Sequence, residues 1–186
     1  MKVTEAIKAR RAYRSLQPVE ITRELVEDLA SHAKLMASCF NNQPWRYVFV
    51  YDKEKLVKLF TALSRSNKWS KQASMIIAAF SKPEDDCQIR DREYHQFDLG
   101  MATATMILRA TELGLVAHPI AGFSPKKTRE ILGIPEEYNV LTLIIVGKKM
   151  DELHPSLNEN QAETEAKRPA RKPFEEWVYH NEYPDK

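Results

Sequence analysis

Three arginines within five residues, Arg10, Arg11 and Arg14, form the group whose type and spacing most directly predict chemistry. Each guanidinium presents a rigid fork of N–H donors that matches the oxygens of a phosphate, and several forks together hold a phosphate dianion through charge-assisted hydrogen bonds. The alternative is a solvent-exposed helix end, where cations complement the helix dipole. The cluster alone favours this alternative, so the other polar stretches have to decide.

Two further polar stretches suggest binding chemistry. The loop from Ser38 to Trp45 contains Ser38, Asn41 and Gln43, whose hydroxyl and amide groups suit a planar ring system that carries amides. A second basic cluster follows at 168–172. Each basic cluster is flanked by apolar residues that would anchor it to the core. The two clusters are therefore expected to converge on one anion.

The chain lacks the motifs of several common functional classes. Its 5 glycines form neither a GxGxxG turn nor a Walker loop, which argues against a Rossmann dinucleotide site and a P-loop NTPase. No HExxH motif and no Cys/His zinc spacing occur, so no metal is expected. No GxSxG supports a hydrolase, although a Ser-His-Asp triad is assembled in space and needs no particular sequence order.

Size and charge further limit the number of domains and the kinds of partner that the chain could bind. With 186 residues, 43% of them hydrophobic, the chain is long enough for one domain with a substantial core. The net charge of +2 gives no global field of the kind that gathers nucleic acid or anionic lipid. No apolar leader segment and no run of membrane-spanning length is present, so we expect no membrane partner. Two cysteines, Cys39 and Cys87, cannot build a disulfide framework, and a reducing cytoplasm is expected.

Ordinary core elements are predicted around the polar stretches. The apolar spacing and the capping residues predict a short first helix that ends near the arginines, a second helix with Thr22 as its N-cap, a third capped by Asp52 and another that Ser124 opens and Gly133 closes. Strands are predicted at 46–51, 74–80, 115–120 and 140–147, the last of them central in the sheet.

The longest predicted helix, 96–113, is rich in small residues, including Gly100, Ala102 and Ala104, and Gly114 ends it. Small residues let another backbone approach closely. The neighbour could be the same helix in a second subunit or an element of the same chain, and the sequence leaves both open. The organisation predicted overall is a core at 1–150, a polar surface linker at 151–167 and a C-terminal segment at 168–186.

The sequence resembles the FMN-dependent nitroreductases. The resemblance lies in five stretches, 9–14 (Ala-Arg-Arg-Ala-Tyr-Arg), 41–45 (Asn-Asn-Gln-Pro-Trp), 112–115 (Glu-Leu-Gly-Leu), 121–123 (Ala-Gly-Phe) followed by 131–135, and 171–176 (Arg-Lys-Pro-Phe-Glu-Glu). Each stretch is weak alone, but their order and spacing are specific, and they span nearly the whole chain apart from 151–166. The resemblance implies an α+β fold of three layers, α-β-α, around a mixed, mostly antiparallel sheet, and a homodimer with FMN at the interface.

The resemblance also implies where FMN would bind. Arg10 and Arg171 would hold the phosphate, with Arg11 and the Ala12 backbone beside it, and Arg14 would lie near the N1/O2 edge of the ring. Ala12 stands where the family often has serine, which removes one hydroxyl donor.

The ring itself would be held by other stretches. The partner subunit would supply Ser38, Cys39 and Asn41, while Ala121 and Gly122 would offer backbone N–H groups near N5. Ala121 stands where some members have glutamate. Asn67 would reach the pyrimidine edge. The alternatives are a gap-filling Cys39, a Gln43 that satisfies backbone and an Asn67 that serves a turn.

The activity that this resemblance implies is ping-pong oxidoreduction. NADH or NADPH would deliver hydride to N5 and leave, and a small organic acceptor such as a nitroaromatic, quinone or enone would then take the electrons. No catalytic side chain is expected, because the flavin carries the chemistry. The alternatives are a flavin-sequestering protein without significant turnover and a phosphate- or nucleic-acid-binding module.

Overall fold

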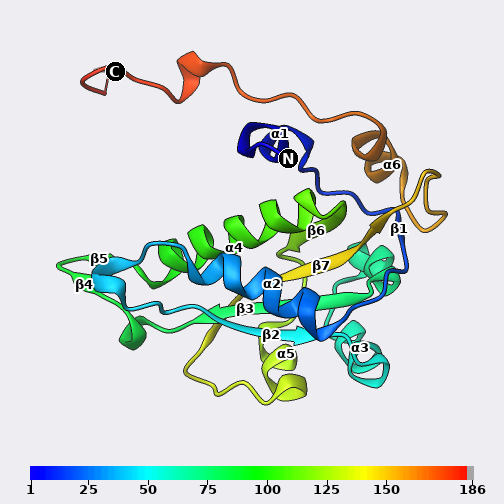
Figure 1. Ribbon diagram of the computed structural model, residues 1–186, viewed down its shortest axis with the longest axis horizontal. Helices are drawn as coiled ribbons and strands as arrows, with labels where there is room; N and C mark the ends of the chain where they lie inside the picture. Colours follow the sequence, from blue (N-terminus) through cyan, green and yellow to red (C-terminus); the bar gives the residue numbers. More distant parts are fainter. Residues whose placement is uncertain (184–186) are drawn as a thin grey trace.

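The structure, a computed structural model, describes residues 1–183 (Figure 1). Its α-helices are α1 (Val3–Ala9), α2 (Arg23–Lys34), α3 (Lys53–Phe60), α4 (His95–Glu112), α5 (Pro125–Leu132) and α6 (Glu159–Ala166). Its strands are β1 (Leu16–Gln17), β2 (Arg46–Val50), β3 (Met75–Ser81), β4 (Gln88–Ile89), β5 (Arg92–Glu93), β6 (Leu115–Ile120) and β7 (Asn139–Lys149). Short 3-10 helices include η1 (Cys39–Asn41) and η2 (Arg65–Gln72).

The main sheet is built around β7, which pairs with β1, β3 and β6, while β2 pairs with the far side of β3. Every strand pairing within residues 1–183 is antiparallel. The predicted central strand is therefore confirmed. Its length, 11 residues, lets one strand pair with three strands that precede it in the sequence.

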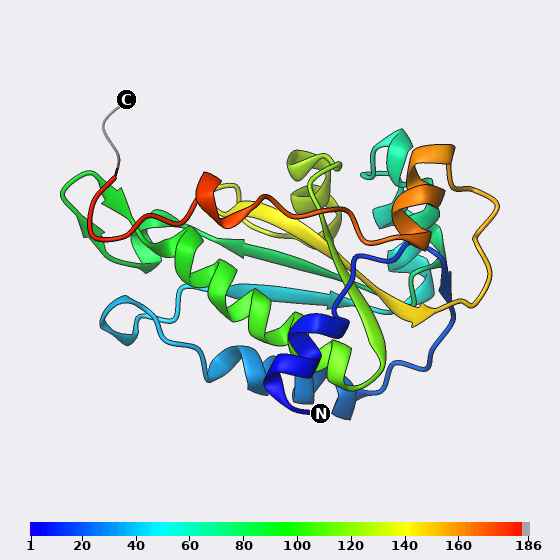
Figure 2. The same ribbon diagram turned by 90° about the horizontal axis from the view of Figure 1, so that it is seen from above.

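Helices cover both faces of the sheet (Figures 1 and 2). Alternate side chains of β3 enter different cores, with Met75, Ile77 and Ala79 on the face covered by α2 and α4, and Ile76 and Ala78 on the face covered by α3. All seven residues of β3 are buried, as expected for a strand packed on both sides. The result is the predicted three-layer α-β-α arrangement.

The predicted helix boundaries follow the capping residues. Thr22 accepts the backbone N–H of Leu25 at 3.2 Å, and Asp52 accepts that of Lys55 at 2.9 Å. Gly133 ends α5 at a φ of 68°, a left-handed conformation that costs glycine little. These local signals were sufficient to place the helices that support the core.

The stretch predicted as a polar linker, 151–167, contains α6. A capping box formed by Asn158 and Gln161 begins this helix, and it lies beside the arginine segment that follows α1 (Figure 2). Beyond α6 the chain runs back along the same side of the molecule as α1 (Figure 1). Of the predicted segment 168–186, the last three residues lie outside the described part of the chain.

Among the described residues, no helix combines the length and the apolar character needed to cross a membrane.

Candidate functional site

A basic pocket lies between the arginine segment, α6 and the C-terminal segment. It has a volume of about 170 Å³ and is lined by Arg10, Arg11, Ala12, Arg14, Thr164, Arg168, Pro169 and Arg171. The two basic clusters, 158 residues apart between Arg10 and Arg168, therefore meet in space, as the sequence predicted. The pocket holds five arginines and no acidic side chain among its lining residues.

Arg10 differs from its neighbours in having no partner for its side chain: within residues 1–183, its guanidinium makes no hydrogen bond and no ion pair. Burial and the nearby charges of Arg168 and Arg171 lower its pKa. Arg168 donates to the backbone carbonyls of Lys8 and Arg10 at 2.6 and 2.9 Å, so its position is fixed by the end of α1. A half-buried cation that faces other cations is unfavourable, and a bound anion would offset that repulsion.

Arg11 and Arg14 instead contact α6. Arg11 donates to the carbonyls of Thr164 and Glu165 at 2.8 and 3.0 Å and lies over the ring of Tyr13. The last carbonyls of a helix lack intrahelical partners, so Arg11 completes the end of α6. Arg14 donates to Thr164 Oγ1 at 3.2 Å. The three clustered arginines thus have different surroundings, which the sequence could not reveal.

Glu165 fixes the backbone of the arginine segment. Its carboxylate is 5% exposed and accepts the N–H groups of Arg14, at 2.9 and 3.0 Å, and of Ser15, at 2.8 Å. Glu165 and Thr164 carry no signal in the sequence, because α6 has no apolar stripe to mark it as part of the core. Arg168 lies in the basic run that the sequence singled out, so a signal for it was present.

His118, on β6, also contacts the backbone of the arginine segment. Its Nδ1 atom lies 3.0 Å from the carbonyl oxygen of Tyr13, and its ring stacks on Trp69 with centroids 4.7 Å apart. Burial lowers the pKa of His118 to about 4. The ring is therefore neutral at pH 7, and the proton on Nδ1 is donated to Tyr13.

Asn67, Ala121 and Gly122 lie together in a second group. The amide of Asn67 and the backbone N–H of Ser64 both donate to the Gly122 carbonyl at 2.9 Å. A Cβ at position 122 would lie 2.6 Å from both Asn67 Nδ2 and Ser64 Oγ, so a larger residue there would displace these two side chains. Asn67 thus serves a turn, as the alternative interpretation expected, and its use at a binding site is untested.

This second group is connected to the basic pocket. Gln161 of α6 donates to the carbonyl of Ser66, next to Asn67, at 2.9 Å. The stacking of Trp69 on His118 joins the same η2 segment to β6, directly before Ala121. One side of the molecule therefore carries both groups.

The predicted residues of the η1 loop lie elsewhere, at the opposite end of α4 from α1 (Figures 1 and 2). Ser38 accepts the backbone N–H of Gln43 at 2.9 Å, and Gln43 donates to the carbonyl of Asn41 at 3.2 Å. Cys39 N–H donates to Asp98 at 2.7 Å. A single chain does not bring this loop to its own basic pocket. The expectation that a partner subunit receives it stays a prediction.

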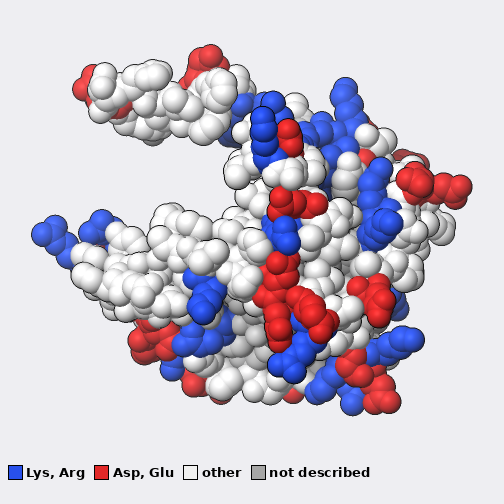
Figure 3. Space-filling model, viewed as in Figure 1, with Lys and Arg blue, Asp and Glu red and all other residues white. Residues whose placement is uncertain are grey.

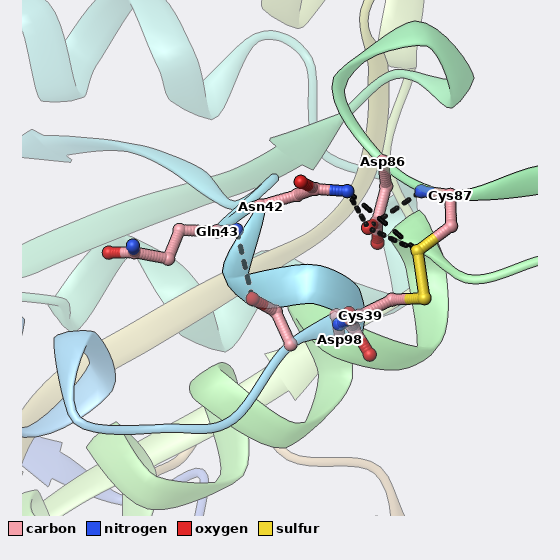
Figure 4. Close-up of a disulfide and its surroundings, with 7 residues drawn as sticks. Cys39, Asn42, Gln43, Asp86, Cys87 and Asp98 are labelled. Atoms are coloured by element: carbon pink, nitrogen blue, oxygen red, sulfur yellow. Dashed lines mark hydrogen bonds between the residues drawn. A yellow bond between two sulfur atoms is a disulfide. The ribbon is translucent and has the colours of Figure 1, made fainter.

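Cys39 and Cys87 are joined by a disulfide, with Cα atoms 6.1 Å apart (Figure 4). The sequence analysis expected two cysteines in a reducing compartment and gave no sign of this pair. The two cysteines, 48 positions apart in the sequence, are brought together because the β4–β5 hairpin returns beside the η1 loop. Cys39 is therefore more than a small side chain filling a gap.

The C-terminal segment leaves a recess between itself and the body of the molecule (Figure 3). Phe174 and Trp177 on this segment are 69% and 57% exposed, and Phe97 on α4 is 61% exposed. Gly100 has open space where a side chain would stand, and Ala104 is exposed. Some small residues of α4, such as Ala102, thus pack in the core against the sheet, while Gly100 and Ala104 lie on an open face of the helix.

Comparisons with known proteins add to these observations. A family model described as "Nitroreductase family" matches residues 7–74 and 64–148. A protein of Archaeoglobus fulgidus named "Putative NADH dehydrogenase/NAD(P)H nitroreductase" is 29% identical over 153 residues, which cover 78% of this chain and 84% of that protein. "Putative NAD(P)H nitroreductase YdgI" of Bacillus subtilis is 25% identical over 185 residues, covering 80% and 88%. A crystal structure described as an oxidoreductase containing FMN superposes with a TM-score of 0.85 at 25% identity, covering 100% of this chain and 95% of that one.

Proposed function

Since this chain belongs to the nitroreductase family and has its fold, we propose that it is an FMN-dependent oxidoreductase that uses NADH or NADPH to reduce a small organic acceptor. The acceptor class comprises nitroaromatics, quinones and enones. The relatives with nitroreductase names and the similar structure that contains FMN support this assignment.

The observation that carries the proposal is the guanidinium of Arg10, which has no partner within residues 1–183 and faces other arginines in the basic pocket. A phosphate dianion fits this donor set, because it offers several oxygens to several forks and cancels their mutual repulsion. The pocket volume of about 170 Å³ is below the roughly 300–1,000 Å³ of sites that enclose a whole organic ligand. The pocket therefore suits the phosphate end alone, held by Arg10 and Arg171.

The ring would extend from the phosphate toward the second group of residues. Arg14 would place its positive charge at the N1/O2 edge, where it stabilises negative charge. The backbone N–H groups of Ala121 and Gly122 would face the N5 region, and Asn67 would face the pyrimidine edge. Arg11 would act mainly by fixing α6, since it already donates to two carbonyls there. Ala12 contributes only its backbone.

When bound, FMN supplies the redox chemistry, accepting hydride at N5 and passing electrons to the acceptor. The side chains of this chain bind the phosphate, orient the ring and set the charge at its edge. None of them is required as a general acid or base.

The proposal includes a homodimer in the cytoplasm. Ser38, Cys39, Asn41 and Gln43 lie far from the basic pocket of their own chain and would complete that of a partner. The exposed aromatic residues of the C-terminal segment and the open face of α4 support this arrangement, because exposed apolar patches of this kind often mark protein interfaces.

Absorbance spectroscopy of the purified protein tests the proposal. We expect a yellow protein that releases FMN on denaturation and loses its visible absorbance when mixed anaerobically with NADH or NADPH. A protein that binds FMN but is never bleached by either nucleotide would instead be a flavin-sequestering protein. A colourless protein that fails to bind added FMN would overturn the cofactor assignment.

Two arginine variants test the phosphate site within the same experiment. Charge-assisted hydrogen bonds contribute about 1.5–3 kcal/mol, so Arg10→Ala and Arg171→Ala should each weaken FMN binding roughly 10- to 100-fold with little loss of fold. Arg23→Ala is a matched control, because Arg23 is exposed on α2 and pairs only with Glu27. If both pocket variants bind FMN as tightly as the control, the phosphate assignment is wrong.

A further inference from the structure

We propose that Cys39, Cys87 and Asp86 form a redox-gated binding site for a soft divalent metal ion such as Zn²⁺. The reduced dithiol binds the ion, and the disulfide excludes it. This site lies at the β4–β5 end of the molecule. It rests on the proposed function through the cytoplasmic location, since compartments of that kind keep thiols reduced, and it shares Cys39 with the η1 loop that would complete a partner's FMN site.

The three candidate ligand atoms are already close together. The two Sγ atoms and one carboxylate oxygen of Asp86 all lie within 4.8 Å of one another. Zinc binds thiolate sulfur at about 2.3 Å and carboxylate oxygen at about 2.0–2.2 Å, so the ligands of a tetrahedral site lie about 3.4–3.8 Å apart. The cluster therefore needs only a small adjustment, and a water molecule would take the fourth position.

The separation of the two cysteines is compatible with both states. Their Cα atoms are 6.1 Å apart, which allows the disulfide seen in Figure 4. Rotation about the two Cα–Cβ bonds separates the sulfur atoms enough for a metal ion to enter between them. The backbone of the η1 loop and of the hairpin need not move far.

Asp86 provides an independent observation that points to a ligand. Its Oδ1 atom accepts the backbone N–H of Cys87 at 2.8 Å and the amide of Asn42 at 3.3 Å. Its Oδ2 atom is buried, no N–H group within residues 1–183 donates to it, and the carboxylate of Asp98 lies close to that of Asp86. A buried acceptor that receives no hydrogen bond is destabilising, and a cation beside the carboxylate would remove this cost.

The surroundings resemble the supporting shell of a metal site. Asn42 and the Cys87 N–H orient the carboxylate, and the Asp98 carboxylate accepts the Cys39 N–H at 2.7 Å and fixes that backbone. Cys39, Asp86 and Cys87 are each only half-buried, so an ion and a small reductant can reach them. Cys39, Asn42, Asp86, Cys87 and Asp98 are all labelled in Figure 4.

The redox step is a two-electron reduction. A water-soluble phosphine breaks the sulfur–sulfur bond, is oxidised to its phosphine oxide with an oxygen atom from water, and leaves two thiols that carry the two protons. Zinc binding then releases the thiol protons to solvent. A phosphine is preferred to a thiol reductant because it does not compete strongly for the metal.

Native mass spectrometry of the full-length protein tests the proposal in both redox states. The oxidised and the phosphine-reduced protein are each given a small excess of Zn²⁺ and then freed of unbound ion. We expect one zinc ion per chain in the reduced sample and none in the oxidised one, and we expect zinc to slow alkylation of the two thiols. A reduced protein that retains no more zinc than the oxidised protein would overturn the proposal.

Two variants separate the ligand set from a general effect on folding. Cys87→Ser should lose zinc binding in both redox states. Asp86→Asn retains both cysteines and should weaken zinc binding at least about tenfold, as loss of groups around metal sites commonly does. Glu84→Gln is the control, because Glu84 is exposed and outside the cluster. Unchanged affinity in a folded Asp86→Asn protein would refute this three-residue site. FMN content is measured in parallel, so failure of the metal site and failure of the proposed oxidoreductase function give different results.

Discussion

At the residue scale, the arginines differ because of the atoms that each one contacts. Arg11 and Arg168 donate to backbone carbonyls, and Arg14 donates to a threonine hydroxyl. Arg10 alone of these four has no such partner within residues 1–183. A cluster that reads as uniform in the sequence therefore divides into residues that hold the scaffold and a residue left available for an anion.

His118 gives a residue-scale prediction about pH. Its pKa is about 4 in the folded chain and about 6.5 in an unfolded one. The folded value is the lower of the two, so the unfolded chain takes up the proton first as pH falls. The stabilising contribution of the neutral ring is thus present above about pH 6.5 and is lost between there and about pH 4. We expect this residue to remove about 3 kcal/mol of unfolding free energy across that window.

Urea titrations at several pH values check this expectation. Other carboxylates also respond to acid, so the informative quantity is the difference between the parent protein and His118→Gln, whose amide keeps a donor for the Tyr13 carbonyl. The parent should lose stability more steeply with falling pH than the variant. Parallel curves would show that His118 titrates similarly in both states.

At the element scale, α6 is a short helix whose position depends on its ends. Isolated helices of 8 residues are unstable in water, so its neighbours must hold it in place. Asn158 and Gln161 close its N-terminus, while Arg11 and the buried Glu165 join its C-terminus to the arginine segment. The helix is thus a support for the basic pocket, although it contributes little apolar surface.

Glu165→Gln tests this support. The amide keeps one acceptor but turns an N–H₂ group toward the backbone N–H groups of Arg14 and Ser15, so we expect a loss of about 1–3 kcal/mol in unfolding free energy. FMN affinity should fall about tenfold, and the affinity for riboflavin, which lacks the phosphate, should fall less. Glu163→Gln, on the exposed side of the same helix, should change neither. An unchanged ratio of FMN to riboflavin affinity would contradict the positioning role.

The elements that sequence analysis predicted are those with apolar periodicity or capping signals. The fully apolar run of β3, the central β7 and the capped helices α2, α3 and α5 belong to this set. By contrast, α6 lacks an apolar face, and its anchor is a carboxylate that receives backbone N–H groups. The Cys39–Cys87 pair was also missed, because a spacing of 48 residues carries no information until the fold is known.

At the scale of the whole molecule, the residues predicted to bind FMN lie in two separate regions of one chain. Arg10, Arg14 and Arg171 line one pocket. Ser38 and Asn41 lie at the end of α4 that is farther from α1. The sequence could not give this separation, since it depends on how the sheet and α4 set the distance between the two ends.

The homodimer is the prediction that belongs to this scale. Light scattering should give a mass of about 43 kDa, twice the 21.5 kDa of one chain. Trp177→Ser should shift the protein toward monomer and reduce its FMN content, because loss of the partner removes the η1 loop from the site. Val57→Ser is the control, since Val57 is 63% exposed on α3, away from the recess. A parent protein that is monomeric while retaining FMN would contradict the shared site.

The central place of β7 also determines when this chain can fold on the ribosome. Within residues 1–183, strands β1 and β6 pair only with β7, which ends at Lys149, and until then β3 has only β2 as a partner. At translation rates of about 5–20 residues per second, the apolar β3 segment waits on the order of several seconds for that partner. Slower translation between residues 81 and 139 would lengthen the interval in which the β3 segment lacks this partner.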